Sequence, residues 1–217
     1  MSSIGNRIIW SFNRSPSEII ENLKRFPVAN IDDCMNRIAA VDQSIRPFNK
    51  AKLAGSAFTI RLPEGDNLMF HKAMDMAEPG DVIMIDAGGS TSRAIFGELM
   101  ATYCKVRGLA GIVVDGCIRD SAAISEMDFP IYAKGVTPNG PYKNGPGEIN
   151  VPIVIGGKVV YPGDIVVGDS DGIVIIKPEF ASELIKQVES VMEKEVGIME
   201  KILNEGSYFR PWVDEKL

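Results

Sequence analysis

The residues best suited to chemistry are the adjacent pair Arg119-Asp120, near the middle of the chain. They follow residues 110–114, a run too apolar for a one-sided strand, which therefore predicts a strand covered on both faces. The Asp115-Gly116 dipeptide after this run predicts a turn. Open α/β sheets bind ligands just past the C-terminal ends of such strands, so the pair indicates a ligand site. A surface ion pair that closes a loop is the alternative.

The segment before this strand is predicted to be a helix that positions the pair. Apolar residues recur at Leu99, Tyr103 and Val106, the spacing of one helix face. Gly108 suits the left-handed residue that follows the last turn of a helix. The polar loop of residues 86–93 contains two glycines but matches no nucleotide-binding motif. It could instead bring a small anion to the free N–H groups of the helix N-terminus.

Elsewhere, short helices alternate with apolar strands, which predicts an α/β fold. Helices are expected from Pro16 to about Arg25, from Asp32 or Asp33 to Ala40, and over residues 67–77, 121–127 and 178–203. In the helix of residues 67–77, the candidate core residues are Leu68, Ala73 and Met76. Strands are expected over residues 52–62, 82–85 and 130–133, and residues 151–155, 158–161, 165–167 and 172–176 predict an antiparallel meander. Residues 134–149 form either a mobile flap over the site or an ordered surface loop. No linker divides the chain, so residues 1–217 are expected to form one domain.

Composition excludes several classes of function. The net charge of −6 argues against a nucleic-acid partner, and no apolar run is long enough to indicate a membrane partner. The single histidine, His71, excludes a zinc site with two histidines and has no GxSxG serine to partner it. His71 has either a packing role or contact with the site. Cys34, Cys104 and Cys117 include no CxxC pair, and with no secretory signal they predict reduced thiols in the cytoplasm.

A set of short motifs carries a family resemblance. The motifs are Gly97-Glu98-Leu99, Arg107-Gly108, Val114-Asp115-Gly116 with Arg119-Asp120, and Pro162-Gly163-Asp164 with Asp169-Ser170-Asp171-Gly172. Together they resemble the RraA-like family from Asp33 to about Gly206. This family contains 4-hydroxy-4-methyl-2-oxoglutarate aldolases and regulators of ribonuclease activity. The resemblance implies a swivelling β/β/α domain with a mixed central sheet or barrel, flanking helices and a long C-terminal helix, assembled as homotrimers or homohexamers with sites between subunits.

The resemblance also implies a cofactor and its ligands. In the aldolases of this family a divalent metal, Mg²⁺ or Mn²⁺, holds a small 2-oxo acid substrate. Asp120 resembles the direct metal ligand. Glu98 resembles an acid that holds metal-bound water, and Glu195 resembles a second such acid supplied by the neighbouring subunit. Arg119 resembles the group that neutralises the enolate oxygen.

The remaining expected site residues would bind the substrate. The backbone N–H groups of Leu99 and Met100 would bind the pyruvyl carboxylate, in a helix that starts near Gly97. Lys143 could reach the far carboxylate of a diacid. Retro-aldol cleavage or decarboxylation of a 2-oxo acid leaves a pyruvate enolate, whose charge a hard cation and a fixed guanidinium stabilise. No lysine Schiff base is then required.

Two functions remain open at this point. The first is a metal-dependent class II aldolase that cleaves 4-hydroxy-4-methyl-2-oxoglutarate-type acids to pyruvate and also decarboxylates oxaloacetate. The second is a non-catalytic regulator that binds a ribonuclease. The regulators resemble this pattern but typically lack the acid after the arginine, whereas this chain has both Asp120 and Glu98. The enzyme is therefore favoured.

Overall fold

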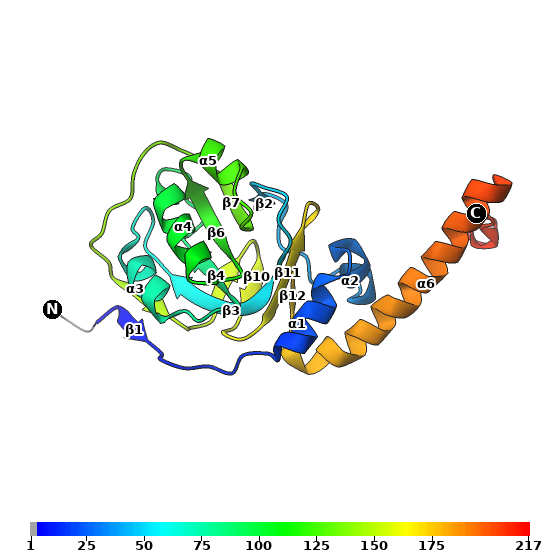
Figure 1. Ribbon diagram of the computed structural model, residues 1–217, viewed down its shortest axis with the longest axis horizontal. Coiled ribbons are helices and arrows are strands. Elements are labelled where there is room, and N and C mark those ends of the chain that lie inside the picture. Colours follow the sequence, from blue (N-terminus) through cyan, green and yellow to red (C-terminus); the bar gives the residue numbers. More distant parts are fainter. Residues whose placement is uncertain (1–3) are drawn as a thin grey trace.

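A mixed β-sheet forms the centre of the computed structural model, which describes residues 4–217 (Figure 1). Four neighbouring strands run parallel in it: β3 (Leu53–Arg61), β4 (Asp81–Asp86), β6 (Gly111–Ile118) and β7 (Ile131–Val136). All eight residues of β6 are buried, as expected for a strand covered on both faces. Because the four strands are parallel, their C-terminal ends meet at one edge of the sheet.

The other strands extend this sheet or pack against it. They are β1 (Asn6–Ile8), β2 (Arg46–Pro47), β5 (Ala94–Phe96), β8 (Gly147–Ile149), β11 (Ile165–Asp169) and β12 (Gly172–Ile176), with a separate hairpin of β9 (Ile153–Ile155) and β10 (Lys158–Val160). The predicted four-stranded meander is wrong in its pairing, because β11 pairs with β3 and not with β10. The cause is the turn before β11: Gly163 N–H donates to Ala57 of β3, and Ala57 N–H donates to Asp164.

Helices cover the sheet in two groups. Helices α3 (Leu68–Met76), α4 (Glu98–Val106) and α5 (Ser121–Ser125) pack on one face, around a core that includes Phe58 and Ile60 of β3. Helices α1 (Ser17–Lys24), α2 (Val28–Cys34) and α6 (Ala181–Glu205) pack beside β11 and β12. Two short 3₁₀ turns, Pro178–Phe180 and Pro211–Val213, flank α6. The predicted mixed α/β sheet with flanking helices and a long C-terminal helix is confirmed.

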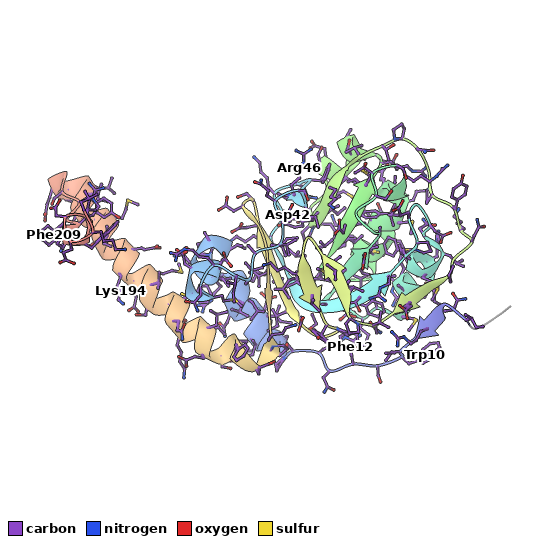
Figure 2. The ribbon with its side chains drawn as sticks, turned by 180° about the vertical axis from the view of Figure 1, so that it is seen from behind. Trp10, Phe12, Asp42, Arg46, Lys194 and Phe209 are labelled. Atoms are coloured by element: carbon purple, nitrogen blue, oxygen red, sulfur yellow. The ribbon has the colours of Figure 1, made fainter. Side chains whose placement is uncertain are left out.

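The apolar packing of α6 against the body is concentrated in its first half. Leu184 and Val188 are buried in this half. Farther along, Val196, Met199 and Leu203 expose 59%, 55% and 76% of their surface. Figure 1 shows this distal half projecting away from the sheet, and Figure 2 labels Lys194 on it and Phe209 just beyond its end. A helix with an exposed apolar stripe is typical of a surface that contacts a partner. In the part of the chain described, no helix is long and apolar enough to cross a membrane.

The sequence prediction of α2 was wrong in position. The helix spans Val28–Cys34 and begins directly after Pro27, so Asp32 lies inside it. The Asp32 carboxylate accepts hydrogen bonds from the N–H groups of Ala39 and Ala40, at 2.9 and 3.1 Å. This carboxylate therefore fixes the chain that follows the helix and does not begin a new one.

The predicted core face of α3 was also partly wrong. Ala73 is buried as expected, but Leu68 is 39% exposed and Met76 is only partly buried. The buried residues are instead Met69, Phe70, Ala73 and Met74. The spacing of the apolar residues fits either face, and packing on β3 selects the one that carries Phe70.

Candidate active site

Arg119 and Asp120 lie between the end of β6 and the start of α5, at the edge where the parallel strands end. The turn predicted at Asp115-Gly116 is wrong, because β6 continues to Ile118. Its pairing with β7 is irregular between Val114 and Cys117, and the Asp115 carboxylate is paired with Lys134 of β7 at 2.7 Å. A β-bulge thus replaces the turn and brings the Arg-Asp pair farther along the strand.

Asp120 has an unusual backbone conformation. Its φ of 57° and ψ of 37° lie in the left-handed region, which residues other than glycine rarely adopt. Its Oδ2 atom accepts a hydrogen bond from the N–H of Glu98 at 3.1 Å, and the Nε atom of Arg119 lies 3.7 Å from the same oxygen. The side chains of Arg119 and Asp120 are 47% and 43% exposed. Strained residues of this kind cluster at functional sites, and here the strain places a carboxylate beside a helix N-terminus.

Gly97 provides the space that this arrangement needs. A Cβ atom added at Gly97 would lie 2.1 Å from Oδ2 of Asp120 and 2.9 Å from Cγ of Arg119. Any other residue at this position would therefore displace the Asp120 carboxylate. The main-chain bond from Arg119 N–H to the carbonyl of Phe96, at 3.0 Å, ties the two segments together.

The first turn of α4 has backbone N–H groups beside the Asp120 carboxylate. The helix begins at Glu98 after Gly97, as predicted, and its first main-chain bond runs from Ala101 N–H to the Gly97 carbonyl. Asp120 takes the N–H of Glu98. Within residues 4–217 no acceptor is found for the N–H groups of Leu99 and Met100. Two unpaired donors at a helix N-terminus suit a carboxylate.

A pocket of about 340 Å³ brings most of the predicted residues together. Its lining includes Gly97, Leu99, Met100, Arg119, Asp120 and Lys143. Glu98 is exposed at its border, next to Gly97. Asp120 and Glu98 offer only carboxylate oxygens, and hard divalent cations such as Mg²⁺ and Mn²⁺ prefer oxygen ligands and waters. The donor set therefore fits a hydrated divalent cation.

Sequence reasoning missed Asn67 and left the role of His71 open, yet both line this pocket. Asn67 is 2% exposed; its amide nitrogen donates to the Ile95 carbonyl at 2.8 Å, while its Oδ1 atom has no partner in the described chain. The Nε2 atom of His71 is also buried without a partner there. Burial, followed by the nearby Lys143 ammonium, lowers the pKa of His71. The imidazole is therefore neutral at pH 7.

Glu195 is not in this pocket. It lies on α6, where its Oε2 atom accepts a hydrogen bond from Asn30 of α2 at 2.7 Å. In the described residues no group of three or more His, Cys, Asp or Glu side chains could hold a metal. Within one chain, Asp120 and Glu98 therefore lie at the candidate site, whereas the third predicted acid, Glu195, does not.

The apolar face of α4 that the sequence spacing identifies faces solvent. Leu99, Tyr103 and Val106 are 84%, 42% and 80% exposed. The buried positions of this helix are Ala101 and Cys104, and burial raises the pKa of the Cys104 thiol to about 12. The small residues let the helix lie close to the sheet, so the larger apolar residues form a solvent-facing stripe that begins at the pocket.

Residues 137–146, which follow β7, form an ordered wall of the pocket and not a loose flap. Arg93 donates to the Gly140 carbonyl at 2.7 Å, and Ala94 N–H donates to the Asn139 carbonyl at 2.8 Å. Of the two alternatives, the ordered loop is the one observed. The predicted loop also ends earlier, because residues 147–149 form β8.

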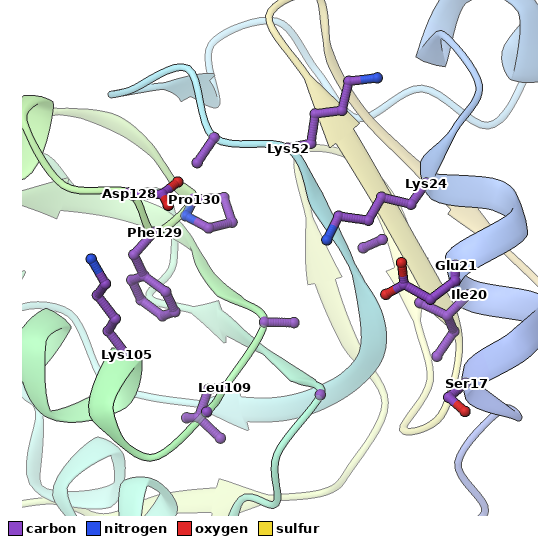
Figure 3. Close-up of a pocket in the computed structure, with 15 residues that line it drawn as sticks. Ser17, Ile20, Glu21, Lys24, Lys52, Lys105, Leu109, Asp128, Phe129 and Pro130 are labelled. Carbon is purple, nitrogen blue, oxygen red and sulfur yellow. The ribbon is translucent and has the colours of Figure 1, made fainter.

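A larger cavity of about 430 Å³ lies at a different place, between α1 and the starts of the central strands. Figure 3 shows that Lys24 and Lys52, which both line it, point in different directions. None of the predicted site residues lines this cavity. The smaller pocket at the strand ends, which contains the strained carboxylate, is therefore the candidate active site.

Comparison with known proteins points to one family. The family model described as RraA-like, Aldolase/RraA, matches residues 28–175. A protein of Halalkalibacterium halodurans named "Putative 4-hydroxy-4-methyl-2-oxoglutarate aldolase" is 42% identical over 160 residues, which is 73% of this chain and 76% of that protein. Helix α6 lies beyond the matched residues 28–175.

Solved structures agree with this assignment. The RNA-processing inhibitor RraA from Thermus thermophilis is similar with a TM-score of 0.65 and 30% identity, over 70% of this chain and 92% of that one. An uncharacterized protein from Pseudomonas syringae pv. tomato shares the fold with a TM-score of 0.78 and 21% identity, over 91% of this chain and 98% of that one.

Proposed function

Because the chain belongs to the RraA-like family, we propose that it is a metal-dependent lyase that releases pyruvate from 2-oxo acids. The proposed substrates are of the 4-hydroxy-4-methyl-2-oxoglutarate type, with oxaloacetate decarboxylation as a second activity. The observation that carries the proposal is the strained Asp120, whose carboxylate is held beside Arg119 and the N-terminus of α4. The naming of the Halalkalibacterium halodurans relative supports the same class of reaction.

The proposed cofactor is Mg²⁺ or Mn²⁺, held directly by Asp120 and through water by Glu98. When bound, the cation supplies Lewis-acid stabilisation of negative charge on the 2-oxo oxygen. Octahedral Mg²⁺ keeps several waters, so a site with one direct carboxylate is sufficient. Both carboxylates are solvent-accessible at the pocket, which allows waters to complete the shell.

The residues of the chain would then divide the work as follows. The free N–H groups of Leu99 and Met100 bind the pyruvyl carboxylate and fix the substrate. Cleavage of the C3–C4 bond releases a carbonyl compound, with the C4 hydroxyl proton lost to water, or releases CO₂ from oxaloacetate. The electron pair is left on C3 as a pyruvate enolate, which then takes up a proton from water. The Arg119 guanidinium, which lines the pocket, stabilises the enolate oxygen. Lys143 binds the far carboxylate of a diacid substrate.

The first prediction concerns the metal. The purified protein with Mg²⁺ is expected to release pyruvate from oxaloacetate, and EDTA is expected to abolish this release because no other group of the pocket replaces the cation. Coupled reduction of pyruvate by lactate dehydrogenase measures the rate, corrected for decarboxylation by Mg²⁺ alone. Turnover that survives EDTA would contradict the proposal. Absence of turnover on oxaloacetate and on 4-hydroxy-4-methyl-2-oxoglutarate would favour the alternative, a non-catalytic ribonuclease-binding regulator; the Thermus relative is named an RNA-processing inhibitor.

We also propose that the protein acts as a homotrimer or homohexamer in which the site is completed between subunits. Two exposed apolar surfaces support this assembly: the α4 stripe of Leu99, Tyr103 and Val106, and the distal part of α6. Packing one on the other would remove both from water. It would also bring Glu195 of α6 near a neighbour's pocket, where it would hold a metal-bound water.

The second prediction tests this sharing. Glu195→Ala is expected to lose about 10–100-fold in activity, the usual effect of an outer-shell partner. After subunit exchange in equal mixtures with Asp120→Ala, about a quarter of the sites of a cyclic oligomer would regain both acids from different subunits. Pyruvate release measures this recovery. Glu193→Ala, an exposed acid on the same helix, is the control and should be silent. Lack of recovery in the mixture would show that no acid is shared.

A further inference from the structure

The buried side chain of Asp66, which has no part in the proposed reaction, holds one wall of the pocket in place. Asp66 is only 4% exposed, and it lies directly before Asn67 and α3. Its Oδ1 atom accepts the N–H of Leu68 at 2.9 Å, and its Oδ2 atom accepts the N–H groups of Asn144 and Gly145 at 2.6 and 3.1 Å. Three N–H donors satisfy the oxygens of this side chain, which would otherwise be costly to bury.

These bonds join two parts of the pocket that are distant in sequence. Leu68 begins α3, the helix that carries His71, and Asn144 directly follows Lys143. The main chain repeats the connection, because Asn67 N–H donates to the Tyr142 carbonyl at 3.0 Å and Tyr142 N–H donates to Gly65 at 2.7 Å. Asp66 therefore fixes the position of the Lys143 backbone relative to α3.

Arg93 holds the same wall from its other side. Its guanidinium donates to the Gly140 carbonyl at 2.7 Å and to the Tyr142 hydroxyl at 2.8 Å, and it lies 4.1 Å from the centre of the Tyr142 ring. Gly65 makes room for this arginine, because an added Cβ atom would lie 2.7 Å from the Cδ atom of Arg93. The segment that carries Lys143 is thus anchored at both ends.

We propose that Asp66 is a positioning residue that sets where the Lys143 ammonium meets the second carboxylate of a diacid substrate. The inference rests on the proposed function and adds a residue that determines specificity for diacids over monoacids. A lysine ammonium is a point charge on a flexible stem, so its contribution depends on where the backbone holds it. In a segment rich in glycine and proline, two anchors supply that fixed position.

The test compares a diacid with a monoacid in the full-length protein. Asp66→Asn keeps one oxygen acceptor and loses the other, so the Lys143 segment is released from one anchor. KM for 4-hydroxy-4-methyl-2-oxoglutarate is expected to rise about tenfold, the loss of one uniform binding interaction, while kcat changes little. Exchange of the methyl protons of pyruvate with deuterium, followed by NMR, requires no far carboxylate and should be unchanged. Glu64→Gln, an exposed acid of the same turn, is the control.

A double-mutant cycle shows whether Asp66 acts through Lys143. Lys143→Ala alone should raise KM for the diacid, and adding Asp66→Asn should raise it less than about twofold more, because the two residues share one interaction. Additive effects, or an equal loss of pyruvate proton exchange, would overturn the proposal. Arg93→Gln removes the contacts of Arg93 with Gly140 and Tyr142 without altering α3, and it should give the same selective rise in KM. This variant replaces Asp66→Asn in the test if Asp66→Asn does not fold.

Hydrogen exchange separates this inference from the proposed function. The amides of Asn144 and Gly145 are bonded to Asp66, so they should be protected in the wild type and should lose protection in Asp66→Asn, whatever the substrate. If these amides lose protection in Asp66→Asn but the wild type turns over no substrate, the anchoring role of Asp66 is supported and the proposed enzymatic function is refuted. Unchanged protection would refute the anchor itself.

Discussion

Replacing Asp120 with alanine is expected to lower pyruvate release by at least about 10³-fold, to the background rate of free Mg²⁺. Asp120 is the only carboxylate of the pocket proposed to touch the cation directly, and charge stabilisation by a bound metal contributes several kcal/mol. The substitution also removes the partner of the Glu98 N–H, a bond of 3.1 Å. Coupled detection of pyruvate over a range of Mg²⁺ concentrations measures the loss.

Asp120→Asn separates the two roles of this side chain. The amide oxygen can still accept the Glu98 N–H, so the local structure is kept, but the charge that holds the cation is lost. Activity should therefore remain as low as in the alanine variant. If Asp120→Asn restored the wild-type rate, the carboxylate would have only a structural role at the N-terminus of α4.

Replacing Arg119 with alanine is expected to lower kcat by about 10²–10³-fold, the usual effect of removing one group that stabilises an oxyanion. Metal affinity should change little, because Arg119 is not a proposed ligand of the cation and lies beside it only through the Asp120 carboxylate, 3.7 Å from its Nε atom. Steady-state kinetics with saturating Mg²⁺ gives kcat, and the concentration of Mg²⁺ at half-maximal rate reports the metal affinity.

Arg119→Lys is the matched variant for this prediction. Lysine keeps the positive charge but lacks the planar guanidinium. In the wild type this guanidinium lies close to Gly140, because a Cβ atom added at Gly140 would lie 3.3 Å from Nη1 of Arg119. Partial activity between the wild type and Arg119→Ala is expected. A large fall in metal affinity with unchanged kcat would instead assign Arg119 to the metal site and refute its role at the enolate.

The parallel part of the fold could be predicted from the sequence because its signals are local. The run before Asp115 is apolar at every position, which only a strand covered on both faces explains, and β6 is fully buried. Gly97 and Gly108 mark the two ends of α4 as expected. Together these signals place Arg119 and Asp120 at the correct edge of the sheet.

Other features depend on contacts that spacing cannot reveal. The repeat of Leu99, Tyr103 and Val106 identifies one face of α4 but not whether protein or solvent covers it, and in the single chain that face is exposed. The pairing of β11 with β3 depends on long-range hydrogen bonds to Ala57. Asn67 follows an ordinary turn sequence, and only its buried, unpartnered oxygen marks it as part of the pocket.

The family model covers the central sheet and ends before the C-terminal helix. The matched region ends at residue 175, before α6 begins at Ala181. Glu195 and the exposed residues Met199 and Leu203 therefore lie outside it. The proposed sharing of the site between subunits depends on this arm, whereas the roles of Arg119 and Asp120 depend on the matched domain.

Binding of Mn²⁺, measured by electron paramagnetic resonance in the presence of oxalate, tests the central claim most directly. Oxalate mimics the chelating half of a 2-oxo acid, and the signal of free aqueous Mn²⁺ falls as the ion binds. The wild type is expected to remove this signal saturably, and Asp120→Ala is expected to leave it at the level of buffer. Equal uptake of Mn²⁺ by the two proteins would contradict the assignment of Asp120 as the ligand that holds the metal.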